Sequence, residues 1–315
     1  MTTARQRRAE TEEAGQGVAP VAAEALRHVR SLLLLGGSLR HSDLTSAVQL
    51  SLLDLPVEPG LSILGHWCQH ARALLAAAGL AGLPIRLLLT QSSSVPQLPA
   101  ERDGCRVTAE TDPFEFRGTG GVLRDTTRGY GPDEYVLVAN AAQVLLEPLP
   151  RTAQAAADLG ADVCVVVHAD GSPSGLMLIR CGCLESVAEV GFVDMKEQAL
   201  PRLATNHHVA VLRCDEPTGL PVRTRSDYIA ALQRYYRRER DTNAPLGPFA
   251  EDWKPTFALA AEGATVSAGA HLHDSVVLGG AQVGTGAVLV RSVVGPGAVV
   301  EQDAMVVDQV VQGRK

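Results

Sequence analysis

Aromatic residues are scarce in this sequence: Phe, Trp and Tyr together make up 4% of its 315 residues. Hydrophobic residues still account for 46%, so we expect a sizeable core built mainly from Leu, Val and Ala. The 28 Lys and Arg residues are outnumbered by 35 Asp and Glu residues, so the formal net charge is −7. This balance argues against a nucleic-acid partner, because phosphate binding requires clustered Lys and Arg.

Cysteine pairs with zinc-site spacing are missing. Cys181 and Cys183 are separated by one residue, and no second pair follows them. On an expected strand these two side chains would point to opposite faces. We therefore expect all six cysteines to be free thiols that are buried or half-buried.

A long apolar run is also missing. No stretch of about 18 apolar residues is present, so we expect neither a membrane span nor a membrane partner. The first 20 residues mix Arg and Glu and lack the apolar segment of a secretory signal. We interpret residues 1–28 as a disordered leader. Free cysteines without a signal predict a cytoplasmic protein.

What the sequence does contain, over residues 29–240, is an alternation of apolar runs and helical patterns. Residues 31–35 are apolar and end in Gly36-Gly37, which is typical of a buried parallel strand and a tight turn. Further strands are expected at 85–89, 136–138, 163–167, 175–181 and 209–214, and helices at 62–78, 151–159, 196–203 and 226–240. This order predicts an α/β domain with a Rossmann-like, mostly parallel sheet. Ligands in such sheets bind at the carboxyl ends of the strands.

The last expected helix ends in several arginines, among them Arg234, Arg237 and Arg238. A solvated face suits them, since cations favour a helix C-terminus, and an anion site is the alternative. Residues 241–257 contain three prolines and are interpreted as a linker.

An internal repeat begins at Val266, and its second copy begins at Val283. Nine positions of the first copy recur unchanged in the second, such as Leu272 at Leu289, and a weaker third copy follows from Val300. Small and aliphatic residues fall about six apart in each copy. This spacing resembles the hexapeptide repeat of left-handed parallel β-helices, which we expect over residues 258–315. So short a solenoid favours an oligomer, either homo- or hetero-oligomeric, that covers its ends.

Two histidines stand out in the first copy. His271 and His273 would share one face of a strand, and some hexapeptide acyltransferases use a histidine on such a coil. The second copy carries Val288 and Val290 at these places, so the coil does not require histidine. We expect both to face solvent.

Two glycine-rich segments carry a resemblance to a known family. Residues 118–124 read Gly-Thr-Gly-Gly-Val-Leu-Arg, and residues 35–37 read Leu-Gly-Gly. Together with the βα sheet and the hexapeptide tail, they make residues 29–311 resemble the sugar-1-phosphate nucleotidyltransferases, such as mannose-1-phosphate guanylyltransferase. That family has a GT-A type fold. It joins a nucleoside triphosphate to a sugar 1-phosphate, releasing pyrophosphate with the help of Mg²⁺.

The resemblance implies a nucleotide site and a weak catalytic candidate. The nucleotide-binding positions are Gly36, Gly37, Gly118, Thr119, Gly120, Gly121 and Asn140. Arg40 stands for the triphosphate-binding arginine, although Ser38-Leu39 replaces the expected Gly-Thr. The short segment 171–174 stands where relatives insert a sugar-contacting stretch. Asp194 belongs to a stretch that resembles the one following the sugar site, and we expect it to cap the next helix.

The resemblance does not extend to the residues that bind the metal in the family. Relatives hold Mg²⁺ with two aspartates, and the matching positions here are Ala142 and Pro221, neither of which offers an oxygen ligand. Asp170 or Asp215 could substitute only if the backbone took another path.

The sequence therefore leaves two main functions open. The first is a catalytically impaired relative that binds a nucleotide, sugar nucleotide or partner subunit in a regulatory or scaffolding role. The second is an active nucleotidyltransferase, which alone would need Mg²⁺ as cofactor. We favour the first, because phosphoryl transfer depends on the charge that the lost carboxylates would bind. Acyl transfer at His271 and His273 is a third possibility.

Overall fold

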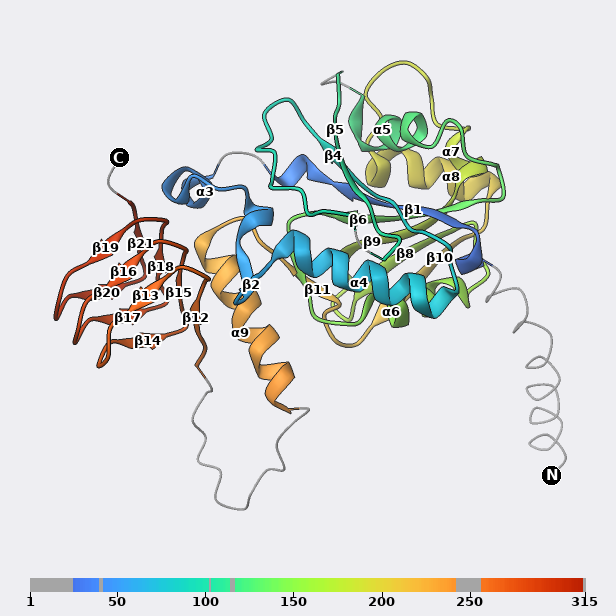
Figure 1. The fold of residues 1–315 in the computed structure, drawn as a ribbon. Helices are drawn as coiled ribbons and strands as arrows, with labels where there is room; N and C mark the ends of the chain where they lie inside the picture. The colour runs from blue at the N-terminus through green and yellow to red at the C-terminus, as the bar shows by residue number, and fades with distance from the viewer. Residues whose placement is uncertain (1–24, 40–41, 102, 114–116, 242–255, 314–315) are drawn as a thin grey trace, which may run out of the picture.

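The computed structural model describes residues 25–39, 42–101, 103–113, 117–241 and 256–313. A mixed α/β domain is followed by a run of short parallel strands that form a β-helix beside it (Figure 1). None of the described helices is long and apolar enough to cross a membrane.

A seven-stranded sheet forms the centre of the α/β domain. Its strands, in spatial order, are β10 (Val209–Cys214), β8 (Val163–His168), β9 (Pro173–Arg180), β6 (Tyr135–Asn140), β1 (Val29–Leu35), β4 (Ile85–Leu89) and β5 (Val107–Thr111). All neighbours are parallel except β9, which is antiparallel to both β6 and β8. The expectation of a mostly parallel sheet is confirmed, with β9 as the reversed strand. Only residues 169–172 separate β8 from β9, and a parallel connection needs a crossover of a dozen residues or more.

Helices cover both faces of this sheet (Figure 1). One face carries α4 (Ile63–Ala78) and α6 (Leu149–Ala157), and the other carries α5 (Gly118–Thr126), α7 (Cys181–Leu184), the π-helical turn η4 (Met195–Ala199) and α8 (Leu200–Asn206). Side chains of β1 alternate between the two cores. Leu32 and Leu34 belong to the core under α4, whereas Leu33 belongs to the core under α5. An almost wholly apolar strand therefore has both faces buried.

The ends of α4 follow from its sequence. Ser62 Oγ accepts a hydrogen bond from Gly65 N at 3.1 Å, and Gly79 adopts the left-handed conformation with φ 63°. Shorter elements fill the connections and were not predicted. They are η2 (Gly36–Ser38), α3 (Asp43–Val48), η3 (Leu52–Asp54), β2 (Pro56–Glu58), β3 (Leu61–Ser62), β7 (Gln143–Leu145) and β11 (Gly219–Pro221).

Two predictions about chain ends need correction. Residues 25–28, assigned to a disordered leader, form a helical turn because Leu26 packs into the core and is 5% exposed. Residues 1–24 lie outside the described part of the chain. Phe257, assigned to the linker, is also buried and stacks on Tyr236 with ring centroids 5.5 Å apart. Linker residues 242–255 are likewise outside the described residues.

The neighbouring cysteines were placed on a strand, and this was wrong. Cys181 and Cys183 both lie on the short helix α7, and both are buried rather than pointing to opposite faces of a sheet. The other expectation is confirmed, since all six cysteines are free, five are buried and Cys214 is half-buried.

The sequence repeat sets the register of the β-helix. His271, Val288 and Met305 occupy equivalent positions in successive copies, and they stack in one column. Three parallel sheets form the walls of the β-helix. The first consists of β12 (Ala258–Ala260), β15 (Ser275–Val277), β18 (Val293–Val294) and β21 (Val310–Val311), and the second of β13 (Thr265–Val266), β16 (Gln282–Val283) and β19 (Val299–Val300). The third consists of β14 (His271–His273), β17 (Val288–Val290) and β20 (Met305–Val307). His271 and His273 face solvent, as expected.

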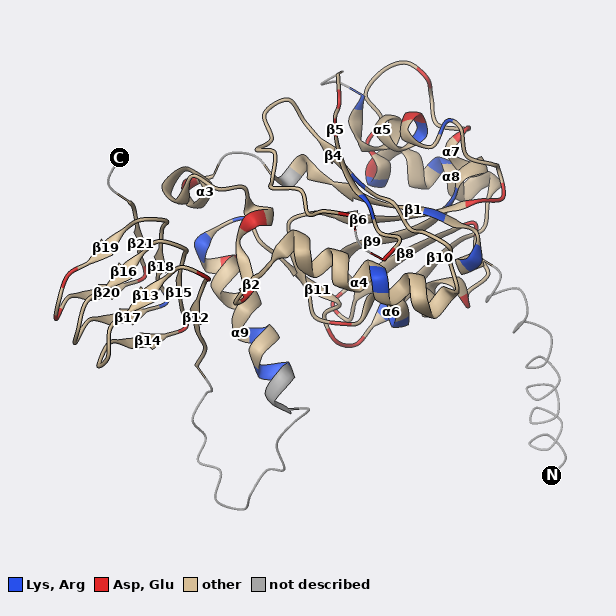
Figure 2. Cartoon of the chain, in the orientation of Figure 1, with Lys and Arg blue, Asp and Glu red and all other residues tan. Residues whose placement is uncertain are grey.

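One corner of each coil joins the β-helix to the other domain. Asp274, Arg291 and Asp308 occupy this corner in successive coils, and all three have positive φ. Arg225, at the start of α9 (Arg225–Asp241), pairs with Asp308 at 3.2 Å and also donates to the carbonyl of Arg291. Gln233 Nε2 donates to Asp274 Oδ2 at 2.8 Å. Helix α9 therefore connects the two domains through polar contacts. The strands of the β-helix themselves carry few charged residues (Figure 2).

A buried histidine, His66, and a half-buried one, His70, form a pair that gives a testable pH dependence. His70 Nδ1 accepts a hydrogen bond from Leu149 N at 3.1 Å, and its ring lies 4.5 Å from that of His66. Burial, followed by the neighbouring His66, lowers the pKa of His70 from 6.5 to about 4. The unfolded chain would bind a proton here below about pH 6.5, whereas folded His70 stays neutral until about pH 4. Stability therefore falls as the pH drops through this window, by on the order of 3 kcal/mol, and the loss levels off below it.

Urea unfolding between pH 4 and pH 8 measures this effect. His70→Gln keeps an acceptor for Leu149 N and should flatten the pH dependence. The matched control, His208→Gln, changes an exposed histidine and should keep the slope of the wild type. Equal slopes in all three proteins would contradict the assignment to His70.

Candidate functional site

A cavity of about 190 Å³ opens where strands β1 and β6 end. Two of the predicted nucleotide-binding residues, Thr119 and Asn140, line it. The other lining residues are Leu35, Val165, Val166, Pro173, Gly175, Leu176, Met177, Asp194, Met195 and Lys196. The cavity lies at the carboxyl edge of the parallel strands, which is where open α/β sheets bind ligands. We call it the strand-end cavity.

The turn at Gly118 is shaped by contact with the chain's own loop. Gly118 has φ 68°, and a Cβ atom there would lie 2.6 Å from the carbonyl carbon of Val193. Val193 N donates to Arg117 O and its carbonyl accepts from Gly120 N, both at 2.9 Å. Gly120 and Gly121 are buried at the start of α5. Small residues are therefore required here by protein packing, whatever ligand the turn meets.

Residues 194–196 form the side of the cavity facing this turn. Thr119 Oγ1 accepts a hydrogen bond from Met195 N at 2.9 Å, which joins the turn to this segment. Asp194 Oδ1 accepts from the backbone N–H groups of Lys196 and Glu197 at 2.8 and 2.9 Å. The expectation that Asp194 caps the next helix is confirmed. Among the described residues that line the cavity, Lys196 is the only cation, and sequence reasoning missed it as a site residue.

Asn140 rests against a glycine of the reversed strand. Gly175 has φ 84°, and a Cβ atom there would lie 2.6 Å from Asn140 Nδ2. Only glycine lets β9 pass this close, so Gly175 fixes the position of the Asn140 amide at the cavity wall. Sequence reasoning did not single out Gly175. The available signal was its place just after the short turn 171–174.

In the glycine-rich segment 35–37, only Leu35 lines the strand-end cavity. Gly36 is buried, and a Cβ atom there would lie 2.7 Å from Leu88 O, so packing against β4 requires this glycine. Gly37 is exposed with open space around its Cα. Arg40, the weak catalytic candidate, lies outside the described residues. The structure thus brings Thr119 and Asn140 together and leaves Gly37 on the open surface.

The two positions expected to hold a metal lie next to each other. Val222 N, just after Pro221, donates to Ala142 O at 2.9 Å, and Pro221 pairs with Gln143 in the β7–β11 ladder. Ala142 is buried, and Val222 is too. Neither Ala142 nor Pro221 offers an oxygen ligand. Within the described residues, a cluster of three or more potential metal ligands occurs elsewhere and not here.

Acidic side chains do gather near the Gly118 turn, but arginines engage them. Arg117 pairs with both Asp112 and Asp125, and Arg86 binds Glu110 through two hydrogen bonds of 2.6 Å. The pKa of Asp125 is lowered, chiefly by a hydrogen bond from Arg124. Burial acts in the opposite direction, and Arg117 lowers the pKa further. These carboxylates line a separate cavity of about 240 Å³ between β4, β5 and α5. Each of these carboxylates already binds a guanidinium group.

Asp170 and Asp215, the two aspartates considered as substitute metal ligands, do not lie at the strand-end cavity. Asp170 Oδ1 accepts from Ser172 N at 2.8 Å within the β8–β9 hairpin, and the Ser172 hydroxyl together with this contact lowers the pKa of Asp170. Asp215 is exposed just after β10. Neither residue lines the strand-end cavity.

No protein-family model matches the chain, and no curated protein matches it. One solved structure similar to it is the crystal structure of the Mycobacterium tuberculosis rv0371c homolog from Mycobacterium sp. strain JC1. The two chains are 18% identical with a TM-score of 0.42, and the match covers 67% of this chain and 98% of that one. A likeness this distant assigns no activity.

Proposed function

We propose that this protein is a catalytically impaired relative of the sugar-1-phosphate nucleotidyltransferases that binds a nucleotide or sugar nucleotide in a regulatory or scaffolding role. The observation that carries the proposal is a cavity lined by two of the motif residues, together with expected metal positions that offer no ligand oxygen. Thr119 and Asn140 meet at the carboxyl edge of the sheet, whereas Ala142 and Pro221 lie side by side without a ligand oxygen.

The strand-end cavity suits part of a nucleotide. About 190 Å³ is less than the roughly 300–1,000 Å³ of whole-ligand pockets, so it would hold one ring system. The Thr119 hydroxyl and the Asn140 amide offer hydrogen bonds to a base or sugar. Lys196 offers a positive charge to a phosphate at the cavity rim.

Two finer assignments belong to the same proposal. The sheet order and the covering helices are compatible with a GT-A type domain, and the stacked coils with a left-handed β-helix. We also propose an oligomer. Val299 and Met305 in the last full coil are 55% and 73% exposed, so a partner subunit would bury apolar surface there.

The alternative is an active nucleotidyltransferase that makes a nucleoside diphosphate sugar. It would need Mg²⁺ held by carboxylates that the expected positions lack. The short hairpin at 171–174 also leaves no room for a longer sugar-contacting segment, since His168 N already bonds Ser172 O at 2.8 Å. These two features favour the impaired relative.

A thermal-shift screen tests the binding claim. We expect a nucleoside triphosphate or nucleoside diphosphate sugar to raise the Tm of the wild type. Lys196→Ala should weaken that ligand about tenfold, as expected for the loss of one charge-assisted contact. Arg202→Ala removes an exposed cation from the neighbouring helix α8 and should leave the affinity unchanged. No shift with any nucleotide, or equal loss in both variants, would sink the claim.

A pyrophosphate assay separates the impaired protein from the active one. The wild type is incubated with nucleoside triphosphates, sugar 1-phosphates and Mg²⁺. We expect no turnover above background, because no carboxylate neutralises the transferring phosphates at Ala142. Turnover of about 1 s⁻¹ or more, an ordinary enzyme rate, would establish the active alternative.

A further inference from the structure

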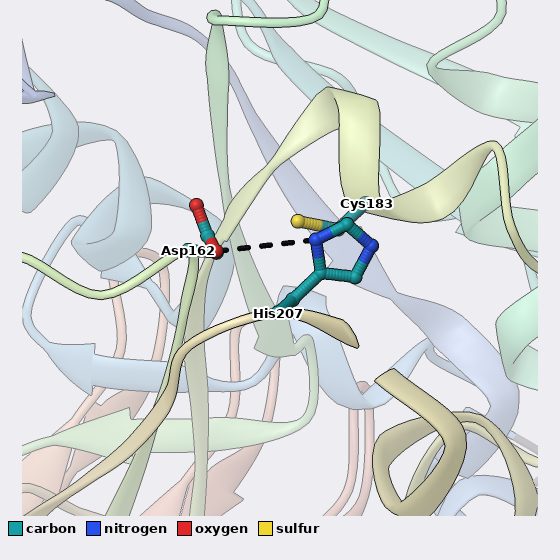
Figure 3. A group of neighbouring side chains, drawn as sticks. All are labelled: Asp162, Cys183 and His207. Carbon is teal, nitrogen blue, oxygen red and sulfur yellow. Dashed lines mark ion pairs between the residues drawn. The ribbon is translucent and has the colours of Figure 1, made fainter. Parts of the chain in front are cut away.

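A cysteine, a histidine and an aspartate converge at the sheet edge opposite the strand-end cavity. Asp162 immediately precedes β8, His207 lies just before β10, and Cys183 belongs to α7, directly after the reversed strand β9. Because β9 runs antiparallel to β8, its carboxyl end lies beside the amino end of β8, which in turn lies beside the amino end of β10. Figure 3 shows the three side chains pointing toward one another from these three segments.

The distances suit one small cation. Asp162 Oδ2 and His207 Nδ1 are 3.9 Å apart, and one ligand atom of each of the three residues lies within 4.8 Å of the others. A tetrahedral metal with bonds of roughly 2.0–2.3 Å would draw these atoms slightly closer. No other such group of three or more occurs in the part of the chain that the structure describes.

We propose that Asp162, Cys183 and His207 form a Zn²⁺ site. A thiolate, an imidazole and a carboxylate are ligands that zinc accepts together, whereas Mg²⁺ and Ca²⁺ prefer oxygen alone. Cys183 binds as the thiolate and its proton passes to solvent. Asp162 and Cys183 then contribute two negative charges, which balance the divalent ion. Water fills the fourth position, since the Asp162 and His207 side chains are 25% and 20% exposed.

Neighbouring groups already hold the carboxylate in place. Arg180 Nε donates to Asp162 Oδ1 at 2.7 Å, so this oxygen is engaged and Asp162 offers Oδ2 to the metal. The backbone N–H of His208 also donates to Oδ2, at 2.9 Å, and leaves a second lone pair on that oxygen. Partners of this kind orient metal ligands in known sites. Arg180 also pairs with Asp133 at 3.2 Å, and this carboxylate offsets the repulsion between the Arg180 guanidinium and a bound cation.

The position of the site indicates a structural role. The three ligands come from three chain segments whose strands neighbour one another in the order β10, β8, β9. A zinc ion bound to all three would tie this edge of the sheet to α7. The strand-end cavity lies at the other ends of the strands, so the proposed ion is independent of nucleotide binding.

Metal titration of the full chain tests the site. The protein is treated with a chelator, dialysed, and titrated with Zn²⁺ or with Co²⁺, which reports thiolate ligation by a charge-transfer absorption band. We expect about one bound zinc per chain by elemental analysis and a cobalt–thiolate band. Zinc at about one hundred times its Kd should raise the Tm by roughly 5 °C.

Matched variants identify the ligands. Cys183→Ser should abolish the cobalt–thiolate band, and His207→Asn should weaken zinc binding at least about tenfold. Cys181→Ser changes a buried cysteine on the same helix, and His208→Asn changes the adjacent exposed histidine. Both controls should bind zinc as the wild type does. Circular dichroism verifies that each variant is folded, and His207→Asn provides a half-exposed site if Cys183→Ser unfolds.

Two outcomes would overturn the proposal. The first is a wild type that binds no zinc after dialysis and shows no cobalt–thiolate band. The second is a band that survives in Cys183→Ser but disappears in Cys181→Ser, which would place the metal elsewhere. Neither outcome bears on the nucleotide assays, because those use the strand-end cavity and different residues.

Discussion

Gly118→Ala is expected to destabilise the folded protein by about 3–4 kcal/mol and to abolish nucleotide-dependent thermal shifts. Two costs add together. Alanine in the left-handed region costs roughly 1–2 kcal/mol, and its Cβ would lie 2.6 Å from the carbonyl carbon of Val193. The backbone of the Val193 loop must then move. That movement separates Met195 N from Thr119 Oγ1 and opens the wall of the strand-end cavity.

Gly37→Ala is the matched control for this prediction. It lies in the other glycine-rich segment, where a Cβ atom would meet nothing within 4 Å. Urea unfolding should place Gly37→Ala within about 0.5 kcal/mol of the wild type. If Gly118→Ala were equally mild, the contact with Val193 would not be what requires glycine at the turn. A Gly37→Ala protein of normal stability that binds nucleotide weakly would instead place the phosphates over Gly37.

The elements that the sequence predicted well are those whose pattern is local. The run at 31–35 is apolar apart from Ser31 because both faces of β1 are buried, and it was assigned as a buried strand. The helix α4 carries a recognisable capping residue at each end, with Ser62 before it and Gly79 after it. Successive coils of the β-helix share identical residues, so its register could be predicted by aligning the copies before any coordinates were known.

The elements that the sequence did not predict depend on distant contacts. The apolar run at 176–179 does not mark β9 as the reversed strand, since β6 and β8 on either side of it are apolar as well. Cys181 and Cys183 continue that apolar pattern and were taken for part of the strand. The chain instead turns into α7 there, and Cys181 N donates to Glu134 O at 2.7 Å in a different part of the fold.

The same reason limits what the sequence says about the sites. Thr119 and Asn140 were proposed from motifs, and the structure brings them to one cavity. Lys196 and Gly175 join them only because the loop at Val193 folds over α5 and the hairpin at 171–174 is short. Motif spacing likewise gave no sign of the Asp162, Cys183 and His207 cluster, because its members come from three separate segments.

The largest core prediction concerns Trp67, which contacts the segment at residues 141 and 142. Its side chain is 0% exposed, and its Nε1 donates to Ala141 O at 2.9 Å. Trp67→Ala should lower the free energy of unfolding by about 3–5 kcal/mol, because it leaves a cavity and removes the hydrogen bond to Ala141 O. Urea unfolding measures the loss. The control is Gln69→Ala, which alters an exposed residue of the same helix and should change stability by less than about 0.5 kcal/mol.

Trp67→Phe separates the packing of Trp67 from its hydrogen bond. Phenylalanine keeps most of the packing but removes one of the two hydrogen bonds that Ala141 O accepts; the other comes from Gln143 N at 3.0 Å. A loss of about 0.5–1.5 kcal/mol is therefore expected. Unchanged stability would mean that this hydrogen bond does not hold the segment. The segment is also fixed by Ala141 N bonding Leu35 O at 3.0 Å and Val222 N bonding Ala142 O at 2.9 Å. A carboxylate could take the place of Ala142 only by breaking such bonds. These bonds fix the path of residues 141 and 142, and the Trp67 hydrogen bond is one of the contacts that hold them there.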